Sequence, residues 1–328
     1  MNALLNKIAE SCGVPFSAIE SGLKNAHAHV KLVKIPKRNG AGFRHAFQPS
    51  SKLKIVQYWV IDNILDKLEV HSSCAAFVRG SSIKKNAKSH ANNKYLIRID
   101  LKNFFPSLFF DDFRSHIECW CKSQSDPVLR NVYAVSELVK KACFFRDEDL
   151  PIGYPTSPLI ANAVMLEFDK KVEDVVSSIF KDGDVIYTRY ADDLVFSSNI
   201  KGRCKAIEKI VRDVVSASVR PKIKVNDSKT RYMSRNGGSA IVTGVLIRSD
   251  AGLTLPRSYK DRVRLMLSRL AAGKDLKETK SQIRGHLNHI RDIDPGFYTS
   301  LVSKYFSVCK DYVQNAKNGF VSAEDDNN

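Results

Sequence analysis

The stretch YTRYADDLVFSS, residues 187–198, places two adjacent aspartates, Asp192 and Asp193, between two apolar runs. The alternating apolar residues on each side predict a β-hairpin with the aspartates at its tip. Two carboxylates held at one turn repel each other, and the repulsion grows where water is excluded. The pair is therefore stable only if the acids point apart, stay in bulk water or share a cation. Because aspartate is a common turn residue, a solvated turn without function is the alternative.

A third carboxylate, Asp100, ends a strand predicted over residues 95–99. If this strand lies beside the hairpin, three carboxylates converge at one edge of a sheet. Hard oxygen ligands that leave room for water and phosphate suit Mg²⁺. Two such ions about 3.5–4 Å apart form the arrangement that enzymes use for in-line phosphoryl transfer. The three aspartates are therefore candidates for a catalytic site with two magnesium ions.

The charge of the chain indicates a polyanionic partner. The 328 residues include 52 Lys and Arg against 35 Asp and Glu, a net charge of +17, which favours nucleic acid. Residues 24–54 carry eight basic side chains and no acid, and residues 79–98 carry six and no acid. Acid-free windows that flank Asp100 favour a track for a phosphate backbone; a charged face without a ligand is the alternative. We see no amphipathic basic helix or lipidation signal that would favour a membrane surface.

The cysteines and the apolar runs predict a cytoplasmic protein without a membrane partner. Seven cysteines without a C-x-x-C pair favour a reducing compartment. No apolar run approaches the roughly 18 residues of a membrane span. The first 14 residues, MNALLNKIAESCGV, contain polar and acidic residues too early for a secretion signal.

The order of the expected elements favours an α+β fold, with a sheet covered by helices on one face. Two short helices are expected in the first 25 residues, and the region after residue 255 is expected to form a helical lobe. The remaining elements are helices over 158–180 and 203–219, a hairpin of strands 185–190 and 194–197, and strands over 222–225 and 240–247. A polar tail over 323–328 is expected to be disordered.

The ordered motifs resemble those of a reverse transcriptase. The strand ending at Asp100 precedes Phe104 and Phe105; LPIGYPTSP follows at residues 150–158, and Tyr190-Ala191-Asp192-Asp193 comes last. The similarity runs from about residue 31 to residue 247 and includes KIPKRNGAGFR, residues 34–44, which is similar to a fingers hairpin. The resemblance implies an RNA-directed DNA polymerase that uses two Mg²⁺ ions.

The resemblance also implies a right-hand polymerase with fingers, palm and thumb. The palm would be an antiparallel sheet backed by helices, and the thumb would be helical. We expect fingers at residues 1–85 and 108–150, palm at 86–107 and 151–252, and thumb at 253–322.

Roles follow from the positions that match the family. Asp100 and Asp192 would ligate both metals, and Asp193 would be a supporting acid. Phe105 would exclude a 2′-hydroxyl, because a ring under the sugar leaves no volume for the extra oxygen. The backbone amides of Asn103 and Phe104 would meet the triphosphate. Core packing is the alternative for the two phenylalanines.

Further positions would contact the deoxynucleoside triphosphate. Gly153 permits close backbone approach, and Pro155 stiffens the loop. Ile152 stands where the family usually has Gln, which removes an amide from the pocket. Arg79 would bind phosphate oxygens bidentately. Lys229 would lie near the leaving phosphate as a general acid, with an ordinary exposed lysine as the alternative.

Two more motifs resemble the signatures of bacterial retron reverse transcriptases. Asn86 and His90 frame N-A-x-x-H, and Val242, Thr243 and Gly244 form V-T-G; a satisfied loop pair and a commonplace tripeptide are the alternatives. The retron resemblance implies that these five residues contribute to binding of the chain's own structured noncoding RNA, and that DNA synthesis is primed from the 2′-hydroxyl of a guanosine. The product would be branched, RNA-linked single-stranded DNA (msDNA), made in antiphage defence with a separate effector protein.

Two other interpretations stay open from the residues alone. The chain could be a different bacterial reverse transcriptase of the diversity-generating, intron-derived or untemplated defence type. It could also be an RNA-binding scaffold with a silent polymerase site, although all three aspartates are present.

Overall fold

The structure is a computed structural model that describes residues 1–313, apart from residues 25, 29, 37–41, 147 and 237. The chain divides into two compact units, and each unit consists of two separate segments of the sequence. The first unit is Met1–Ser81 with Lys94–Tyr232, and the second is Ser82–Asn93 with Met233–Asn328. The boundaries expected for fingers, palm and thumb stay a prediction. The polar tail expected over 323–328 lies outside the described residues.

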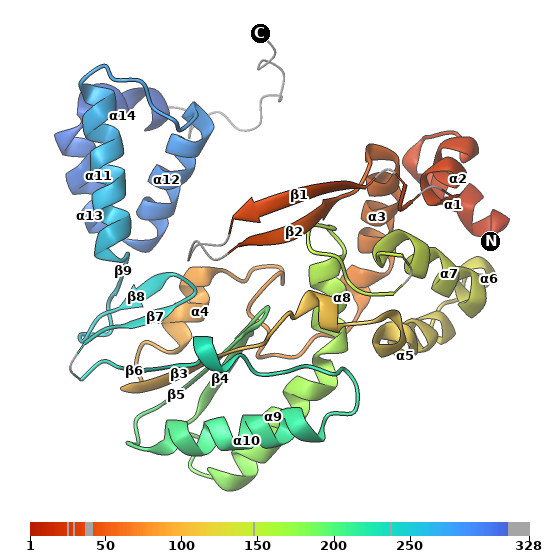
Figure 1. Ribbon diagram of the computed structural model, residues 1–328, viewed down its shortest axis with the longest axis horizontal. Helices are drawn as coiled ribbons and strands as arrows, with labels where there is room; N and C mark the ends of the chain where they lie inside the picture. Colours follow the sequence, from red (N-terminus) through yellow and green to blue (C-terminus); the bar gives the residue numbers. More distant parts are fainter. Residues whose placement is uncertain (25, 29, 37–41, 147, 237, 314–328) are drawn as a thin grey trace. The chain divides into compact units, whose positions relative to one another are not determined.

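A four-stranded sheet of the first unit confirms the α+β prediction. Its strand order is β4-β5-β3-β6, and β5 runs antiparallel to both β4 and β3. Helix α10 packs on β3 and β5 and lies beside α9 (Figure 1). These elements are β3 (Tyr95–Asp100), β4 (Ile186–Tyr190), β5 (Asp193–Ser198), β6 (Arg231–Ser234), α9 (Leu166–Ile179) and α10 (Arg203–Ala217). The apolar run of β3 is buried because the strand lies inside the sheet, between β5 and β6.

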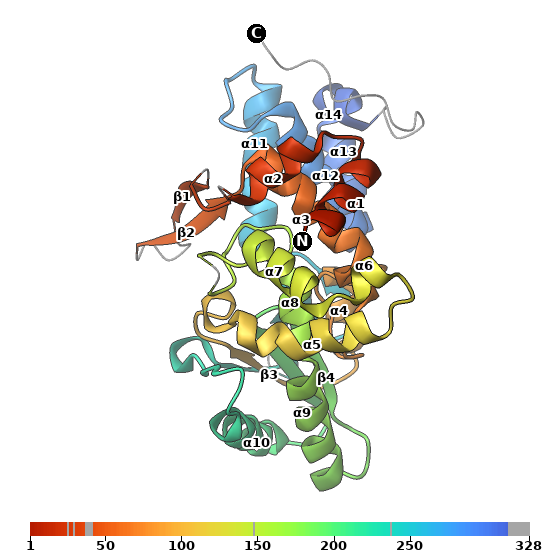
Figure 2. The same cartoon turned by 90° about the vertical axis from the view of Figure 1, so that its right-hand side faces the viewer.

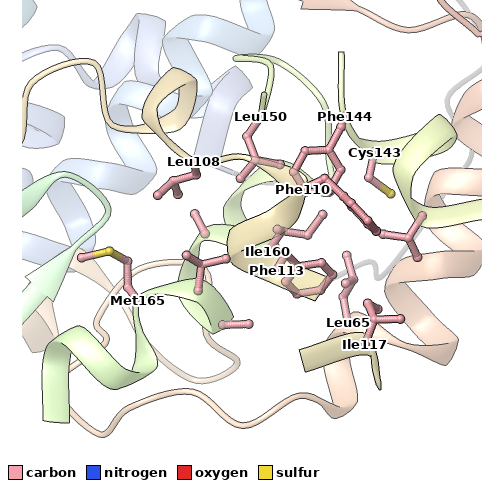
Figure 3. Packing of buried hydrophobic residues seen from close by; sticks show 14 of the residues in the cluster. Leu65, Leu108, Phe110, Phe113, Ile117, Cys143, Phe144, Leu150, Ile160 and Met165 are labelled. Atoms are coloured by element: carbon pink, nitrogen blue, oxygen red, sulfur yellow. The ribbon is translucent and has the colours of Figure 1, made fainter. Parts of the chain in front are cut away.

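Helices make up most of the rest of the first unit, and α5 packs against both α7 and α8 (Figure 2). Between them lies a core of aromatic and aliphatic side chains, among them Phe110, Phe113, Phe144 and Ile160 (Figure 3). Burial of this apolar surface stabilises the unit. The helices are α1 (Asn2–Cys12), α2 (Phe16–Lys24), α3 (Ser51–Asn63), α5 (Phe110–Lys122), α6 (Pro127–Arg130), α7 (Val132–Cys143) and α8 (Ser157–Val164), with short 3₁₀ turns η1 (Leu65–Lys67), η2 (Phe105–Ser107) and η3 (Asp227–Lys229).

Two elements of the first unit differ from the sequence prediction. The single helix expected over 158–180 is two helices, α8 and α9, because the backbone opens at Met165, where ψ is −2°. The strand expected over 222–225 makes a single bridge, from Val225 to Leu101. The segment has the alternating burial of a strand, but backbone hydrogen bonds reach it only at the end of β3.

The loop over residues 150–158 is fixed to a hairpin of β1 (Lys31–Pro36) and β2 (Phe43–Gln48). The backbone N–H of Phe47 donates to the carbonyl of Ile152 over 2.7 Å. Gly153 has a φ of +106°, and a Cβ at this position would lie 2.7 Å from the carbonyl oxygen of Phe47. Only glycine allows this approach of two backbones. The loop is therefore held at the base of the hairpin whose tip, residues 37–41, lies outside the described residues.

The second unit combines one helix, a small sheet and a helical lobe. The strand expected over 240–247 is instead a hairpin, because Thr243 and Gly244 have φ of 48° and 83° and turn the chain. Helix α4 packs on this sheet. The elements are α4 (Ile83–Ser89), β7 (Ala240–Val242), β8 (Val245–Ile247), β9 (Leu253–Thr254), α11 (Arg257–Ala271), α12 (Lys280–Ile293), α13 (Pro295–Lys304) and α14 (Phe306–Val313). In the described part of the chain, no helix is long and apolar enough to cross a membrane.

We predict that Gly153→Ala destabilises the first unit by about 2 kcal/mol or more, because the substitution adds both backbone strain and overlap with Phe47. Urea denaturation of the purified chain measures the change. Gly13→Ala is the matched control, since Gly13 has a φ of +63° but nothing within 4 Å of an added Cβ. The control should cost only about 1 kcal/mol. Equal losses in the two variants would show that the contact with Phe47 contributes nothing.

Candidate active site

The sheet brings the backbones of the three predicted aspartates together. Asp100, the last residue of β3, lies directly across from Asp193, the first residue of β5. The backbone N–H of Leu101 donates to the carbonyl of Asp192 over 2.8 Å. The segments at 100 and at 192–193 are distant in sequence, yet they meet at the same edge of one sheet.

The backbone at this edge is strained. Tyr190 pairs with Asp193, so Ala191 and Asp192 form a two-residue turn, and Ala191 has a φ of 56°. Asn103, in the turn after β3, has a φ of 51°, and Phe77, in the loop before Arg79, has a φ of 57°. Residues other than glycine rarely adopt positive φ, and such strain persists only where the surrounding structure enforces it. The strain at Ala191 and Asn103, which both belong to predicted motifs, motivates a functional interpretation of this edge.

Electrostatic repulsion and burial act on the two hairpin aspartates. Burial, followed by the charge of Asp100, raises the pKa of Asp192 above its usual range. Burial raises the pKa of Asp193 to about 6, with Asp192 and Asp100 adding to the rise and Arg98 opposing it. Both carboxylates would be more stable as anions if more positive charge lay among them.

Two basic side chains and one amide stabilise the carboxylates of Asp100 and Asp193. The Lys229 ammonium lies 2.9 Å from Oδ2 of Asp100, and Asn226 Nδ2 donates to Oδ1 of Asp100 over 2.8 Å. Arg98 Nε lies 3.7 Å from Oδ1 of Asp193. Lys229 was predicted at this site from the sequence, whereas Arg98 and Asn226 were not predicted as partners of the aspartates. Arg98 could have been found, because residues 98 and 100 lie on the same face of a strand.

The donor set fits divalent magnesium. In the part of the chain that the structure describes, no three side chains of His, Cys, Asp or Glu are already gathered closely enough to hold a metal ion. The oxygens of Asp100 and Asp193 instead face Lys229 and Arg98. Carboxylate oxygens are the ligands that Mg²⁺ prefers, and the raised pKa of Asp192 and Asp193 shows that added positive charge would stabilise their ionised forms.

The predicted nucleotide residues after Asp100 take different positions. Phe104 is 4% exposed and belongs to the core, whereas Phe105 is partly buried. Their ring centroids lie 5.4 Å apart. The carbonyl of Asn103 accepts hydrogen bonds from the backbone and the hydroxyl of Ser107, which stabilises the turn after β3. Packing thus accounts for Phe104, and Phe105 remains the candidate for contact with a sugar.

The other predicted nucleotide residues lie in loops of the first unit. Arg79 is 91% exposed and its Nη2 lies 2.8 Å from Oδ2 of Asp66. Gly153 is exposed and Pro155 is partly buried in the loop against β2. An exposed guanidinium in a surface ion pair can change partner at little cost.

The two signature motifs pack together in the second unit. Asn86 on α4 is 2% exposed, and His90 at the end of α4 and Val242 on β7 are fully buried. Thr243 Oγ1 donates to the carbonyl of Ile83 over 3.3 Å, which fixes the Thr243–Gly244 turn to the start of α4. Burial lowers the pKa of His90 to about 4, so this imidazole is neutral near pH 7. Contact of these residues with RNA stays a prediction.

Three comparisons with known proteins place the chain in a family. Residues 35–283 match the family model described as reverse transcriptase (RNA-dependent DNA polymerase). The Retron Ec73 reverse transcriptase of Escherichia coli is 41% identical over 293 residues, which cover 87% of this chain and 89% of that protein. The Retron Ec83 reverse transcriptase of Escherichia coli is 30% identical, with 84% and 87% covered.

A solved structure supports the fold alone. The apo telomerase of Candida tropicalis is similar with a TM-score of 0.51 at 12% identity, over 86% of this chain and 58% of that one. The family match and the identity to retron enzymes lead to the same conclusion. The chain belongs to the reverse transcriptase family, as an RNA-directed DNA polymerase of the retron type.

Proposed function

We propose that the chain copies part of its own structured noncoding RNA, starting from the 2′-hydroxyl of a guanosine in that RNA. The product is msDNA with a 2′,5′ branch, and the biological role is antiphage defence with a separate effector protein in the cytoplasm. The observation that carries this proposal is the 41% identity to the Retron Ec73 reverse transcriptase over 87% of the chain. The packing of N-A-x-x-H against V-T-G supports it.

The three aspartates form the proposed catalytic site. Asp100 and Asp192 would hold two Mg²⁺ ions, and Asp193 would support them. The bound ions supply a lowered pKa at the attacking hydroxyl and stabilisation of the leaving pyrophosphate. Lys229 lies at hydrogen-bond distance from Asp100, and it would give a proton to the leaving pyrophosphate as a general acid.

The incoming deoxynucleotide would lie against the residues that follow β3. Backbone amides of Asn103 and Phe104 would bind the triphosphate, and Arg79 would exchange Asp66 for phosphate oxygens. The loop with Gly153 and Pro155 would cover the base pair, with an apolar Ile152 where an amide is usual. Phe105, which is less buried than Phe104, would lie under the sugar.

RNA binding would fall mainly to exposed basic side chains of the second unit. Lys85 and Lys88 are exposed on α4, while the signature residues Asn86 and His90 are buried. Helix α11 adds the exposed side chains of Arg257, Arg262, Arg264 and Arg269. Phosphates and 2′-hydroxyls of a folded RNA are the groups that such a surface recognises.

We predict that nucleic acid co-purified with the chain contains branched RNA-linked DNA. The chain would be expressed with its flanking genomic sequence, and the nucleic acid would be sequenced before and after treatment with a 2′,5′-debranching enzyme. A single DNA species that is released from RNA only by debranching is the expected result. Unbranched DNA would assign the chain to another type of bacterial reverse transcriptase.

We predict that Phe105→Ala lowers discrimination against ribonucleotides by about 10- to 100-fold, because the smaller side chain makes room for the 2′-hydroxyl. Single-nucleotide extension with deoxy- and ribonucleoside triphosphates measures the ratio of kcat/KM values. Phe104→Leu is the matched control, since it alters the core and should leave the ratio unchanged. Unchanged discrimination in Phe105→Ala would place the sugar gate elsewhere.

A further inference from the structure

A guanidinium with no exposed surface belongs to the first strand of the proposed catalytic hairpin. Arg189 of β4 and Asp169 of α9 are both 0% exposed. Arg189 Nη2 donates to Asp169 Oδ2 over 2.7 Å, and its Nε lies 3.0 and 2.9 Å from the two carboxylate oxygens. Removing two charges from water costs free energy that their mutual attraction only partly returns. Stability alone is therefore a weak explanation for this buried ion pair.

The same guanidinium extends the network to two more segments. Arg189 Nη1 donates to Asn162 Oδ1 on α8 over 3.2 Å, and Asn162 Nδ2 donates to the carbonyl of Ala76 over 2.9 Å. The backbone of Arg189 accepts from the N–H of Ala75 and donates to the carbonyl of Ser73, each over 2.8 Å. Helices α8 and α9, strand β4 and the loop over 73–76 therefore meet at one side chain.

Three of these four segments, β4, α8 and the loop over 73–76, lead into different parts of the proposed site. Strand β4 ends at Tyr190, next to the turn that carries Asp192. Helix α8 begins directly after the loop that contains Gly153. The loop over 73–76 continues into Phe77, whose ring centroid lies 6.3 Å from that of Tyr190, and then into Arg79. Three parts of the site that are far apart in sequence thus share one buried anchor.

We propose that Asn162, Asp169 and Arg189 are positioning residues for the nucleotide site. They fix the loop over 73–76, and with it Arg79, against the hairpin that carries Asp192. The inference rests on the proposed function, because it assumes that this hairpin and Arg79 meet the incoming nucleotide. Loosening the network should weaken nucleotide binding more than it slows the chemical step.

The test is Asn162→Ala, which releases Ala76 without leaving a buried charge unpaired. We expect KM for the deoxynucleotide to rise about tenfold, while kcat stays within about threefold. The matched control is Arg203→Met. Arg203 binds Asp182 and Asp184 at the opposite end of the same hairpin. The control should lower the melting temperature and leave KM unchanged. An unchanged KM in Asn162→Ala, or an equal rise in the control, would overturn the inference.

A paired comparison separates positioning from stability. Asp169→Asn should lower the melting temperature by roughly 10 °C, because it strands the charge of Arg189. Adding Arg189→Met removes that charge and should recover most of the melting temperature, while KM stays raised. Recovery of KM together with the melting temperature would show a purely structural role and overturn the inference.

Asp192→Ala shows which of the two proposals has failed. If Asp192→Ala is inactive while Asn162→Ala has the KM of the unaltered chain, only the positioning role is wrong. If Asp192→Ala is as active as the unaltered chain, the proposed catalytic site is wrong, and the positioning role that rests on it is overturned as well.

Discussion

Repulsion among three carboxylates at the ends of neighbouring strands is the constraint on which the rest of the site depends. The pairing of β3 with β5 puts Asp100 across from Asp193, so the sheet itself enforces the approach. Burial and mutual repulsion raise the pKa of Asp192 and Asp193, which shows that negative charge at this edge exceeds the positive charge around it. Lys229 and Arg98 offset part of this excess negative charge. Divalent cations would offset the remaining charge, and polymerases use such cations for phosphoryl transfer.

The edge of the sheet at which we propose catalysis must be held by rigid neighbours, because small displacements of reacting groups are costly. The first unit does this with a buried guanidinium rather than with apolar packing alone. Arg189 joins two helices, a strand and a loop, and it lies only three positions before Asp192. A strained turn at Ala191 remains in place because its flanking strands are fixed.

In the second unit, three of the five residues that mark the retron type are buried, whereas the basic side chains that we propose for RNA contact are exposed. The side chains of Asn86, His90 and Val242 are buried and hold α4 against the small sheet. These buried residues can act indirectly, by fixing the position of α4 and of the exposed side chains that α4 carries. Exposed lysines on α4 and arginines on α11 are the charges available to a phosphate backbone.

Local pattern and motif order predicted much of this structure. The strand that ends at Asp100, the hairpin after it and the helical lobe beyond residue 255 all follow from apolar periodicity. Periodicity could not show the break at Met165, nor that residues 240–247 turn back at Thr243, because threonine rarely adopts positive φ. Residues 222–225 alternate like a strand but make a single ladder bridge.

Side-chain partners were the least predictable part of the site. The pairing of Asp169 with Arg189 crosses twenty residues, and that of Asp100 with Asn226 crosses 126. Such pairings depend on how helices and strands pack in three dimensions, so no local pattern contains them. The strand pattern predicted Asp100 and Asp192, and the resemblance to a family added Lys229, but neither gave a sign of Arg98, Asn162 or Asn226.

Calorimetric titration of the purified chain with Mg²⁺, without nucleotide or RNA, tests most directly whether the aspartates share divalent cations. The unaltered chain should bind Mg²⁺, and Asp100→Asn and Asp192→Ala should each lose most of that binding, while Asp182→Ala, an exposed aspartate at the far end of the hairpin, should retain it. Equal Mg²⁺ binding in all four chains would contradict the account.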